Sequence, residues 1–183
     1  MGNFYISDLH MFHDKMTECR CITSNDELHA LIKHNWQKAV SDSDTVYVLG
    51  DLGMYHAEEI AEFINKLPGR KILLTGNHDR WNLKCRELRN CFEEIHNYME
   101  IRDQERKVVL CHYPMEDWNG MMEGFFHVHG HVHKSRHQIS VMDNRFNANV
   151  EYNAYTPVTL DELINTRQQQ AVFTLDDDSG SKM

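Results

Sequence analysis

Residues 71–79 read KILLTGNHD, an apolar run followed at once by a glycine and by the polar triplet Asn77-His78-Asp79. A short apolar run that ends on a glycine is typical of a buried β-strand. In α/β proteins, ligands bind in the crevice beyond the carboxyl ends of the strands. This stretch therefore predicts a strand and, directly after it, a set of side chains placed for chemistry.

Four other apolar runs end in the same way, on aspartate or histidine. They are NFYIS before Asp8 and His10, TVYVLG before Asp51, KVVLC before His112, and FFHVHG before His131 and His133. The i, i+2 spacing within the two pairs puts both side chains on one face of an extended chain. Glycines at positions 50, 76 and 130 let the backbone turn sharply and approach a ligand closely. We therefore expect donors that are far apart in sequence to converge on one site.

The wider pattern predicts an α/β protein. The predicted strands are Asn3–Ser7, Thr45–Leu49, Lys71–Thr75, Lys107–Cys111, Phe126–His129, Gln138–Val141 and Ala171–Leu175. Capping-box patterns at 24–27 and 159–162 predict two helix starts, the first with Leu28, Leu31, Ile32 and Trp36 on one face, and a further helix is expected over about 57–67. Strands alternate with helices in the first half and dominate afterwards, which favours sheet buried between helices.

Composition narrows the class of protein. The 183 residues are 41% hydrophobic, which suits one domain with a sizeable core, and we expect that domain to span 1–175 with a disordered tail at 176–183. The chain lacks both a signal-peptide pattern and the roughly 18 consecutive apolar residues of a membrane helix. Five cysteines, an odd number, are expected to be reduced thiols, so a cytoplasmic location is predicted.

The motifs Asp8-x-His10, Gly50-Asp51, Gly76-Asn77-His78-Asp79, His112 and Gly130-His131-x-His133, in this order, resemble the calcineurin-like metallophosphoesterase family. The stretches at 7–13, 110–120 and 149–162 are similar to its small, single-domain bacterial and phage members. The resemblance covers most of the chain. It implies a four-layer α-β-β-α sandwich of two mixed sheets flanked by helices, and a phosphoesterase activity that depends on two metal ions.

The resemblance also implies a role for each motif residue. One metal would be held by Asp8, His10, Asp51 and His133, and the second by Asp51, Asn77, His112 and His131. Asp51 would bridge the two metals. His78 would be the catalytic acid, with Asp79 holding its imidazole ring.

For the two-metal site that the resemblance implies, the mechanism can be argued from the chemistry of the donors. Imidazole, carboxylate and amide donors without a thiolate suit Mn, Fe, Zn, Co or Ni, and we favour Mn in vitro. Two dications against two aspartates leave a formal charge of +2, or +1 with a bridging hydroxide. That charge attracts a phosphate ester within a protein of net charge −9. The hydroxide would attack phosphorus, and a histidine would protonate the leaving alkoxide.

Residues near the motifs are candidate substrate contacts, each with a structural alternative. His13 is expected either to steer substrate or to cap the segment that follows it. Arg80, Arg136 and Arg145 are candidates to bind phosphate oxygens, although solvated surface positions are the alternative. Trp118, with Phe125 and Phe126, forms either an aromatic wall over the site or part of the core.

Three functions are consistent with these features. We expect a phosphodiesterase acting on small or nucleotide-like phosphate esters. A non-catalytic scaffold that binds a protein partner is the first alternative, but it has no need of a complete ligand set. A nuclease is the second, and the net charge of −9 disfavours nucleic acid as a partner because such binding depends on basic residues.

Overall fold

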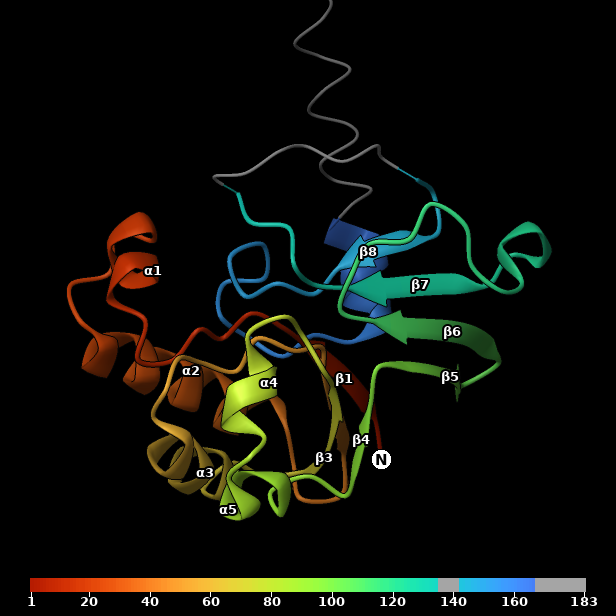
Figure 1. Cartoon of the computed structure of the whole chain (residues 1–183). Coiled ribbons are helices and arrows are strands. Elements are labelled where there is room, and N and C mark those ends of the chain that lie inside the picture. Colours follow the sequence, from red (N-terminus) through yellow and green to blue (C-terminus); the bar gives the residue numbers. More distant parts are fainter. Residues whose placement is uncertain (135–141, 167–183) are drawn as a thin grey trace, which may run out of the picture.

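The computed structural model describes residues 1–134 and 142–166, which form two four-stranded sheets (Figure 1). The first sheet has the order β1 (Asn3–Ile6), β2 (Thr45–Val48), β3 (Arg70–Leu74) and β4 (Glu94–His96), and all its strands are parallel. The second has the order β5 (Tyr98–Asp103), β6 (Arg106–Cys111), β7 (Phe126–His129) and β8 (Arg145–Asn147). Its β5–β6 pair is antiparallel and its other pairs are parallel.

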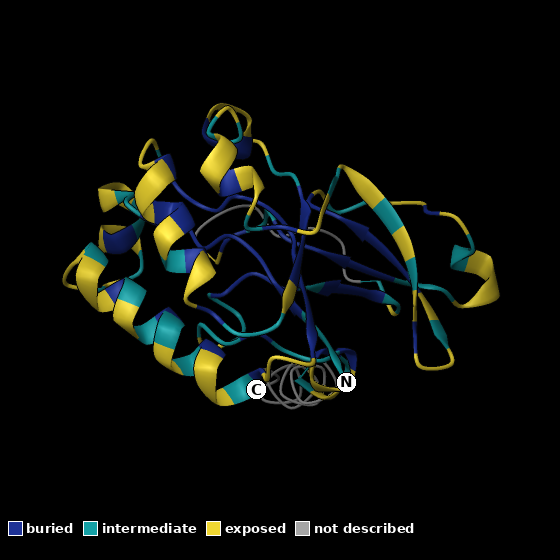
Figure 2. Cartoon of the chain, turned by 90° about the horizontal axis from the view of Figure 1, so that it is seen from below, coloured by how far each residue is buried: buried dark blue, intermediate teal, exposed yellow. Residues whose placement is uncertain are grey.

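Helices flank the first sheet (Figure 1). They are α1 (Asp14–Cys19), α2 (Asn25–Ala39), α3 (Ala57–Asn65), α4 (Asp79–Asn82) and α5 (Arg86–Arg89), and a short 3₁₀ turn, η1 (Met121–Glu123), precedes β7. The buried faces of α2 and α3 turn inward and their exposed faces turn to solvent (Figure 2). A further helical segment begins at Leu160 and runs through the last described residues.

Two hydrophobic cores hold these layers together because the strands of the first sheet are buried on both faces. From β2, Val46 and Val48 pack in the core beneath the helices, where the α2 residue Trp36 is fully buried. Tyr47 packs in the other core, between the two sheets. Removing a buried side chain as large as Trp36 typically costs about 3–5 kcal/mol.

Both predicted capping boxes are present. In the first, Ser24 Oγ accepts a hydrogen bond from the Glu27 backbone N–H, as an N-cap residue does. In the second, Thr159 Oγ1 and the Glu162 carboxylate exchange hydrogen bonds with each other's backbone N–H groups. The described part of the helix that follows buries Leu160 and Leu163 in the core between the sheets.

The expected α/β fold with two sheets flanked by helices is confirmed. The described strands of the first sheet are all parallel, and its antiparallel pairing is an isolated bridge between Tyr5 of β1 and Val158. Five predicted strands match β1, β2, β3, β6 and β7 to within one residue at each end. The predicted strands at 138–141 and 171–175, and the tail at 176–183, lie outside the described residues. That 1–175 form one domain stays a prediction.

Some elements carried no clear sequence signal. The strands β4, β5 and β8 and the helices α1, α4 and α5 were not expected. Among the described residues, no helix has the length and apolar character needed to cross a membrane.

Candidate metal centre

The expected donor side chains gather in two clusters beyond the carboxyl ends of β1, β2, β3, β6 and β7. The first cluster consists of Asp8, His10 and His133, and all three residues are buried. The second consists of Asp51, His112 and His131, with Asn77 beside them. Within each triad, one donor atom per residue lies within 4.8 Å of the others.

The donor atoms of the first cluster have the spacing of ligands around one cation. His10 Nε2 lies 3.2 Å from His133 Nε2, and Asp8 Oδ1 lies 3.7 Å and 3.5 Å from these two nitrogens. Tetrahedral ligands about 2.0–2.2 Å from a metal are themselves roughly 3.3–3.6 Å apart. Asp8 Oδ1 is buried and accepts no hydrogen bond from the described residues. A buried carboxylate oxygen without a partner is costly, and a cation would remove that cost.

The second cluster has similar spacing and is more open. His112 Nε2 lies 3.2 Å from His131 Nδ1 and 3.6 Å from Asp51 Oδ2. Asn77 Oδ1 lies 3.1 Å from the His112 nitrogen and 3.0 Å from the His131 nitrogen, so the amide oxygen joins the triad. The Asn77 residue is exposed and His131 is half-buried, which leaves this cluster accessible from solvent.

Asp51 stands between the two clusters. Its Oδ2 atom lies 3.7 Å from His10 Nε2 and 3.6 Å from His112 Nε2. Its Oδ1 atom accepts a hydrogen bond of 2.9 Å from the His78 backbone N–H. One carboxylate oxygen therefore faces both clusters while the other is held by the backbone.

The backbone that carries these donors is strained. Asp8, His10, Asp51 and His131 have φ angles of 58°, 48°, 56° and 67°, in the left-handed region. This region costs non-glycine residues roughly 1–2 kcal/mol each. Strain of this kind persists only where surrounding structure enforces it, and it gathers at functional sites.

Glycines allow the donor loops to approach each other closely, as the sequence predicted. A Cβ atom on Gly130 would lie 2.5 Å from Asp8 Oδ2 and from Ser7 Oγ. A Cβ atom on Gly76 would overlap the Asp51 carboxylate. Any other residue at these two positions would displace a carboxylate of the site.

Hydrogen bonds to the far ring nitrogens orient two of the histidines. His112 Nδ1 lies 2.7 Å from the Leu49 carbonyl oxygen, and His133 Nδ1 lies 2.6 Å from Glu151 Oε1. A proton held at Nδ1 in this way leaves Nε2 free to bind a metal, a common arrangement at metal sites. Sequence reasoning did not single out Glu151.

Burial and neighbouring charges tune the protonation of the clusters. Burial lowers the pKa of His10 and of His131, which favours the neutral imidazole that metal ions require. Burial opposes ionisation of Asp8, but the imidazoles of His10 and His133 hold its pKa well below the usual range. Burial also disfavours protonation of His133, yet Asp8 and Glu151 raise its pKa to about 9.

The His78 ring lies beside the clusters, as expected, but Asp79 does not hold that ring. The His78 ring is 36% exposed, and its Nε2 atom is 4.0 Å from Asp51 Oδ2. The buried Asp79 carboxylate instead accepts the backbone N–H groups of Asp51, Leu52 and Gly76, at 2.8–2.9 Å. The expectation that Asp79 holds the His78 ring is therefore wrong, because the Asp79 carboxylate is hydrogen-bonded to backbone N–H groups after β2 and β3.

The candidate substrate contacts divide into two groups. His13 is near the site, with its ring centroid 5.6 Å from that of His10 and 6.4 Å from that of His78. Arg80 is exposed on α4, next to His78 and Asp79. Arg136 lies outside the described residues.

Trp118 and Arg145 are buried, which corrects the expectation that they contact substrate. The Trp118 indole N–H donates to the Phe125 carbonyl oxygen, and its ring packs against His127. The Arg145 guanidinium donates to the Met115 carbonyl oxygen at 2.6 Å. For Trp118 the structure supports the alternative of packing into the core, whereas the buried Arg145 does not occupy the solvated surface position that was its alternative.

Tyr113 is an aromatic residue at the site that sequence reasoning missed. Its ring centroid lies 4.9 Å from that of His131 and 5.0 Å from that of His112, and the residue is 45% exposed. Because Tyr113 directly follows the predicted ligand His112, the sequence could have identified it as a residue near the site.

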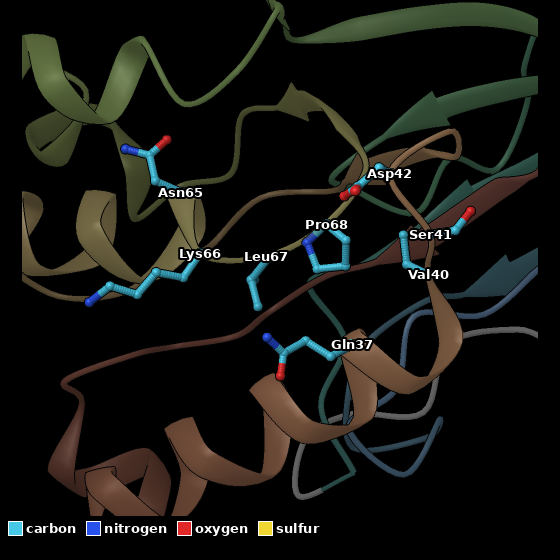
Figure 3. A pocket seen from close by; sticks show the side chains of 8 residues that line it. All are labelled: Gln37, Val40, Ser41, Asp42, Asn65, Lys66, Leu67 and Pro68. Atoms are coloured by element: carbon cyan, nitrogen blue, oxygen red, sulfur yellow. The ribbon is translucent and has the colours of Figure 1, made fainter.

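A hollow elsewhere on the surface is unrelated to these clusters. It lies between the C-terminal ends of α2 and α3, where Gln37, Lys66 and Pro68 line it (Figure 3). These residues precede β2 and β3, so the hollow is at the amino end of the first sheet, whereas the donor clusters lie beyond the carboxyl ends.

The model of the family described as "Calcineurin-like phosphoesterase" matches residues 4–174 of this chain. The chain belongs to this family. The match extends over all the motif residues, and the two clusters of aspartate and histidine are consistent with the two-metal site that a metallophosphoesterase carries.

Individual relatives place the chain among the small members of the family. The "Uncharacterized protein MJ1445" of Methanocaldococcus jannaschii is 29% identical over 183 residues, covering 95% of this chain and 96% of the relative. The "Gene 66 protein" of Mycobacterium phage L5 is 30% identical over 171 residues, covering 74% and 81%. The crystal structure of "Protein of Unknown Function AQ665" from Aquifex aeolicus matches with a TM-score of 0.72 at 30% identity, covering 87% and 96%.

Proposed function

We propose that this family member is a two-metal phosphodiesterase that hydrolyses small or nucleotide-like phosphate esters. The main support for this proposal is the position of the Asp51 carboxylate. Its Oδ2 atom is 3.7 Å from His10 Nε2 in the first cluster and 3.6 Å from His112 Nε2 in the second. One carboxylate oxygen equidistant from two donor clusters suits a pair of adjacent cations.

Each cation would take donors from one cluster together with Asp51. Asp8, His10 and His133 would hold the first, and Asn77, His112 and His131 the second. The donors suit Mn, Fe, Zn, Co or Ni, and Mn²⁺ is the ion of choice for assays. When bound, paired cations lower the pKa of water, orient the phosphoryl group and offset its charge.

His78 would protonate the leaving group. Its backbone N–H is anchored on Asp51 Oδ1, while its ring remains partly exposed beside the clusters. As water loses a proton to solvent and attacks phosphorus, the bond to the leaving oxygen breaks and that oxygen takes a proton from the imidazole. Asp79 would act indirectly, because its hydrogen bonds to backbone N–H groups fix the loops that carry Asp51 and His78.

The surroundings of the clusters favour a diester over a monoester. A dianionic monoester gains most from extra cationic groups, whereas a diester monoanion needs only the metals and an acid for its leaving group. Arg145 is buried and donates to a carbonyl oxygen, so it is not placed to clamp a dianion. The exposed ring of Tyr113, against two second-cluster histidines, offers a surface on which an aromatic substituent can stack.

Metal analysis and paired substrates test this proposal. The purified protein should bind two Mn²⁺ ions per chain and hydrolyse bis(p-nitrophenyl) phosphate with a kcat/KM at least equal to that for p-nitrophenyl phosphate. Asp51→Ala, purified in parallel, controls for contaminating phosphatases. Tyr113→Leu should lower kcat/KM for the aryl diester more than for a diester with a methyl substituent, and Tyr55→Leu, which changes an exposed tyrosine, serves as its matched control.

Other outcomes would assign a different function. A monoester advantage above about tenfold, roughly 1.4 kcal/mol of transition-state stabilisation, would overturn the diester assignment. Two bound metals without hydrolysis of any ester would favour the protein-binding scaffold. A scaffold does not, however, require strained donors or a buried Asp8 oxygen that lacks a hydrogen-bond partner among the described residues. Cleavage of single-stranded nucleic acid with steep salt dependence would indicate a nuclease instead.

A further inference from the structure

A buried ion pair lies directly behind the first cluster. Arg20, at the C-terminal end of α1, donates from Nε to Glu151 Oε1 at 3.0 Å. The Arg20 side chain is 1% exposed and that of Glu151 is 9% exposed. Neither residue belongs to the expected donor set.

Glu151 reaches the cluster through His133. The Oε1 atom that accepts from Arg20 also lies 2.6 Å from His133 Nδ1, and Oε2 accepts the Lys134 backbone N–H at 3.0 Å. The carboxylate thereby holds both the His133 ring and the backbone that follows it. With the proton kept on Nδ1, His133 Nε2 stays directed at Asp8 and His10.

Arg20 reaches the same cluster from the other side. Its two terminal nitrogens donate to the backbone carbonyl oxygens of Asp8, at 2.7 Å, and Leu9, at 3.0 Å. These carbonyl groups belong to the stretch in which Asp8 and His10 adopt left-handed φ angles. A planar guanidinium with several fixed donors suits the task of holding two carbonyl groups and a carboxylate together.

We propose that Arg20 and Glu151 are positioning residues that shape the first cluster for its metal ion, an inference that rests on the proposed two-metal site. The pair links four segments: the loop after β1, the end of α1, the loop after β7 and the segment after β8. Together they hold the Asp8 backbone and the His133 ring at the separation that one cation requires. The second cluster has no equivalent pair among the described residues, and the far nitrogen of its His112 bonds to a neutral backbone carbonyl oxygen.

The inference predicts that the two clusters respond differently to loss of the pair. Replacing the hydrogen-bonded partner of a metal ligand typically costs about 10–100-fold in metal affinity. Glu151→Gln and Arg20→Gln should each weaken Mn²⁺ binding to the first cluster by about that factor and leave the second unchanged. The double variant should lose less than the product of the two factors, because the residues act as a unit.

Variants that isolate each cluster make the test specific. Mn²⁺ binding is measured by calorimetric titration in a His112→Ala background, which retains the first cluster, and in a His10→Ala background, which retains the second. Glu151→Gln should weaken binding in the first background only. The exposed pair Arg70 and Glu93, with N···O of 2.6 Å, supplies matched controls, since Arg70→Gln and Glu93→Gln make the same charge changes away from the site.

Equal loss of metal affinity in both backgrounds, or no loss in the first, would overturn the inference, because either result would mean that the pair contributes only to general stability.

Melting temperature without metal and circular dichroism identify variants that fail to fold. If Glu151→Gln does not fold, Arg20→Lys decides the matter. It keeps the charge but not the guanidinium fork, so unchanged metal affinity in the first background would contradict the proposal. Wild-type protein that binds two metals but hydrolyses no diester would refute only the proposed function.

Discussion

The first and second clusters contain similar donors in different surroundings. In the first, Asp8, His10 and His133 are all buried, and an ion pair lies behind His133. In the second, His112 is buried, but Asn77 is exposed and His131 is half-buried. We infer that the first cluster is built to retain a cation and the second to admit a phosphate ester.

The two clusters also differ in how their histidines are fixed. His133 is held by the carboxylate of Glu151 and His112 by the carbonyl oxygen of Leu49. A carboxylate partner makes the imidazole a more basic metal ligand, whereas a carbonyl oxygen mainly fixes the orientation of the ring. Asp51 belongs to the second cluster and also faces the first, so its loss should affect both clusters.

Asp51→Ala should have the largest effect. It removes the carboxylate that faces both clusters, so metal content should fall below two per chain. Activity should fall by more than the roughly 10²–10⁴-fold that one acid–base group contributes. Metal analysis and kcat/KM for the aryl diester check this, with the exposed Asp42→Ala as control. Full metal occupancy with normal turnover would refute the two-metal site.

His78→Gln should leave both metals bound and reduce kcat by about 10²–10⁴-fold for poor leaving groups. For an activated aryl leaving group the loss should be much smaller, because that group departs without a proton. Rates over a series of leaving groups measure the difference, and His34→Gln, on the exposed side of α2, is the control. An equal loss across the series would argue against the acid, and loss of metal would make His78 a ligand.

Asn77→Ala should sharpen the contrast between the clusters. The amide oxygen lies against two second-cluster nitrogens, and among the described residues it has no hydrogen bond to a donor of the first cluster, so only the second metal should bind more weakly. We expect the affinity for the second metal to fall by at least the roughly 10–100-fold that loss of an outer-shell partner costs, with little change for the first. Competition with a chromogenic chelator resolves the two ions. Parallel weakening of both would mean that the clusters act as a single unit.

Deleting residues 177–183 should have the smallest effect. The deleted sequence, DDSGSKM, contains no donor motif and is too polar to bury. The melting temperature and kcat/KM should match those of the full chain. A drop of several degrees would show that this end of the chain contributes to the folded structure.

The strand-end donors could be predicted because each is marked locally. Asp8 and His10 follow an apolar run at i, i+2 spacing, and His131 and His133 repeat the pattern. The same local signals predicted five strands, since β1, β2, β3, β6 and β7 are buried and their apolar runs are visible in the chain. By contrast, β4 and β5 have mostly exposed or partly buried residues, and their pairing with neighbouring strands makes them β-structure.

The sequence by itself determined which residues bear metal-binding chemistry and that they share one end of the sheets. Only the tertiary structure decided what holds them there. Arg20 and Glu151 are 131 positions apart, and no local pattern pairs them. Asp79 adjoins His78 in sequence but bonds to the backbone of neighbouring loops. Which residues can bind a metal follows from their side-chain type and their position after a strand. Which residues hydrogen-bond to them depends on the polar groups that the fold buries nearby, because buried polar groups need partners.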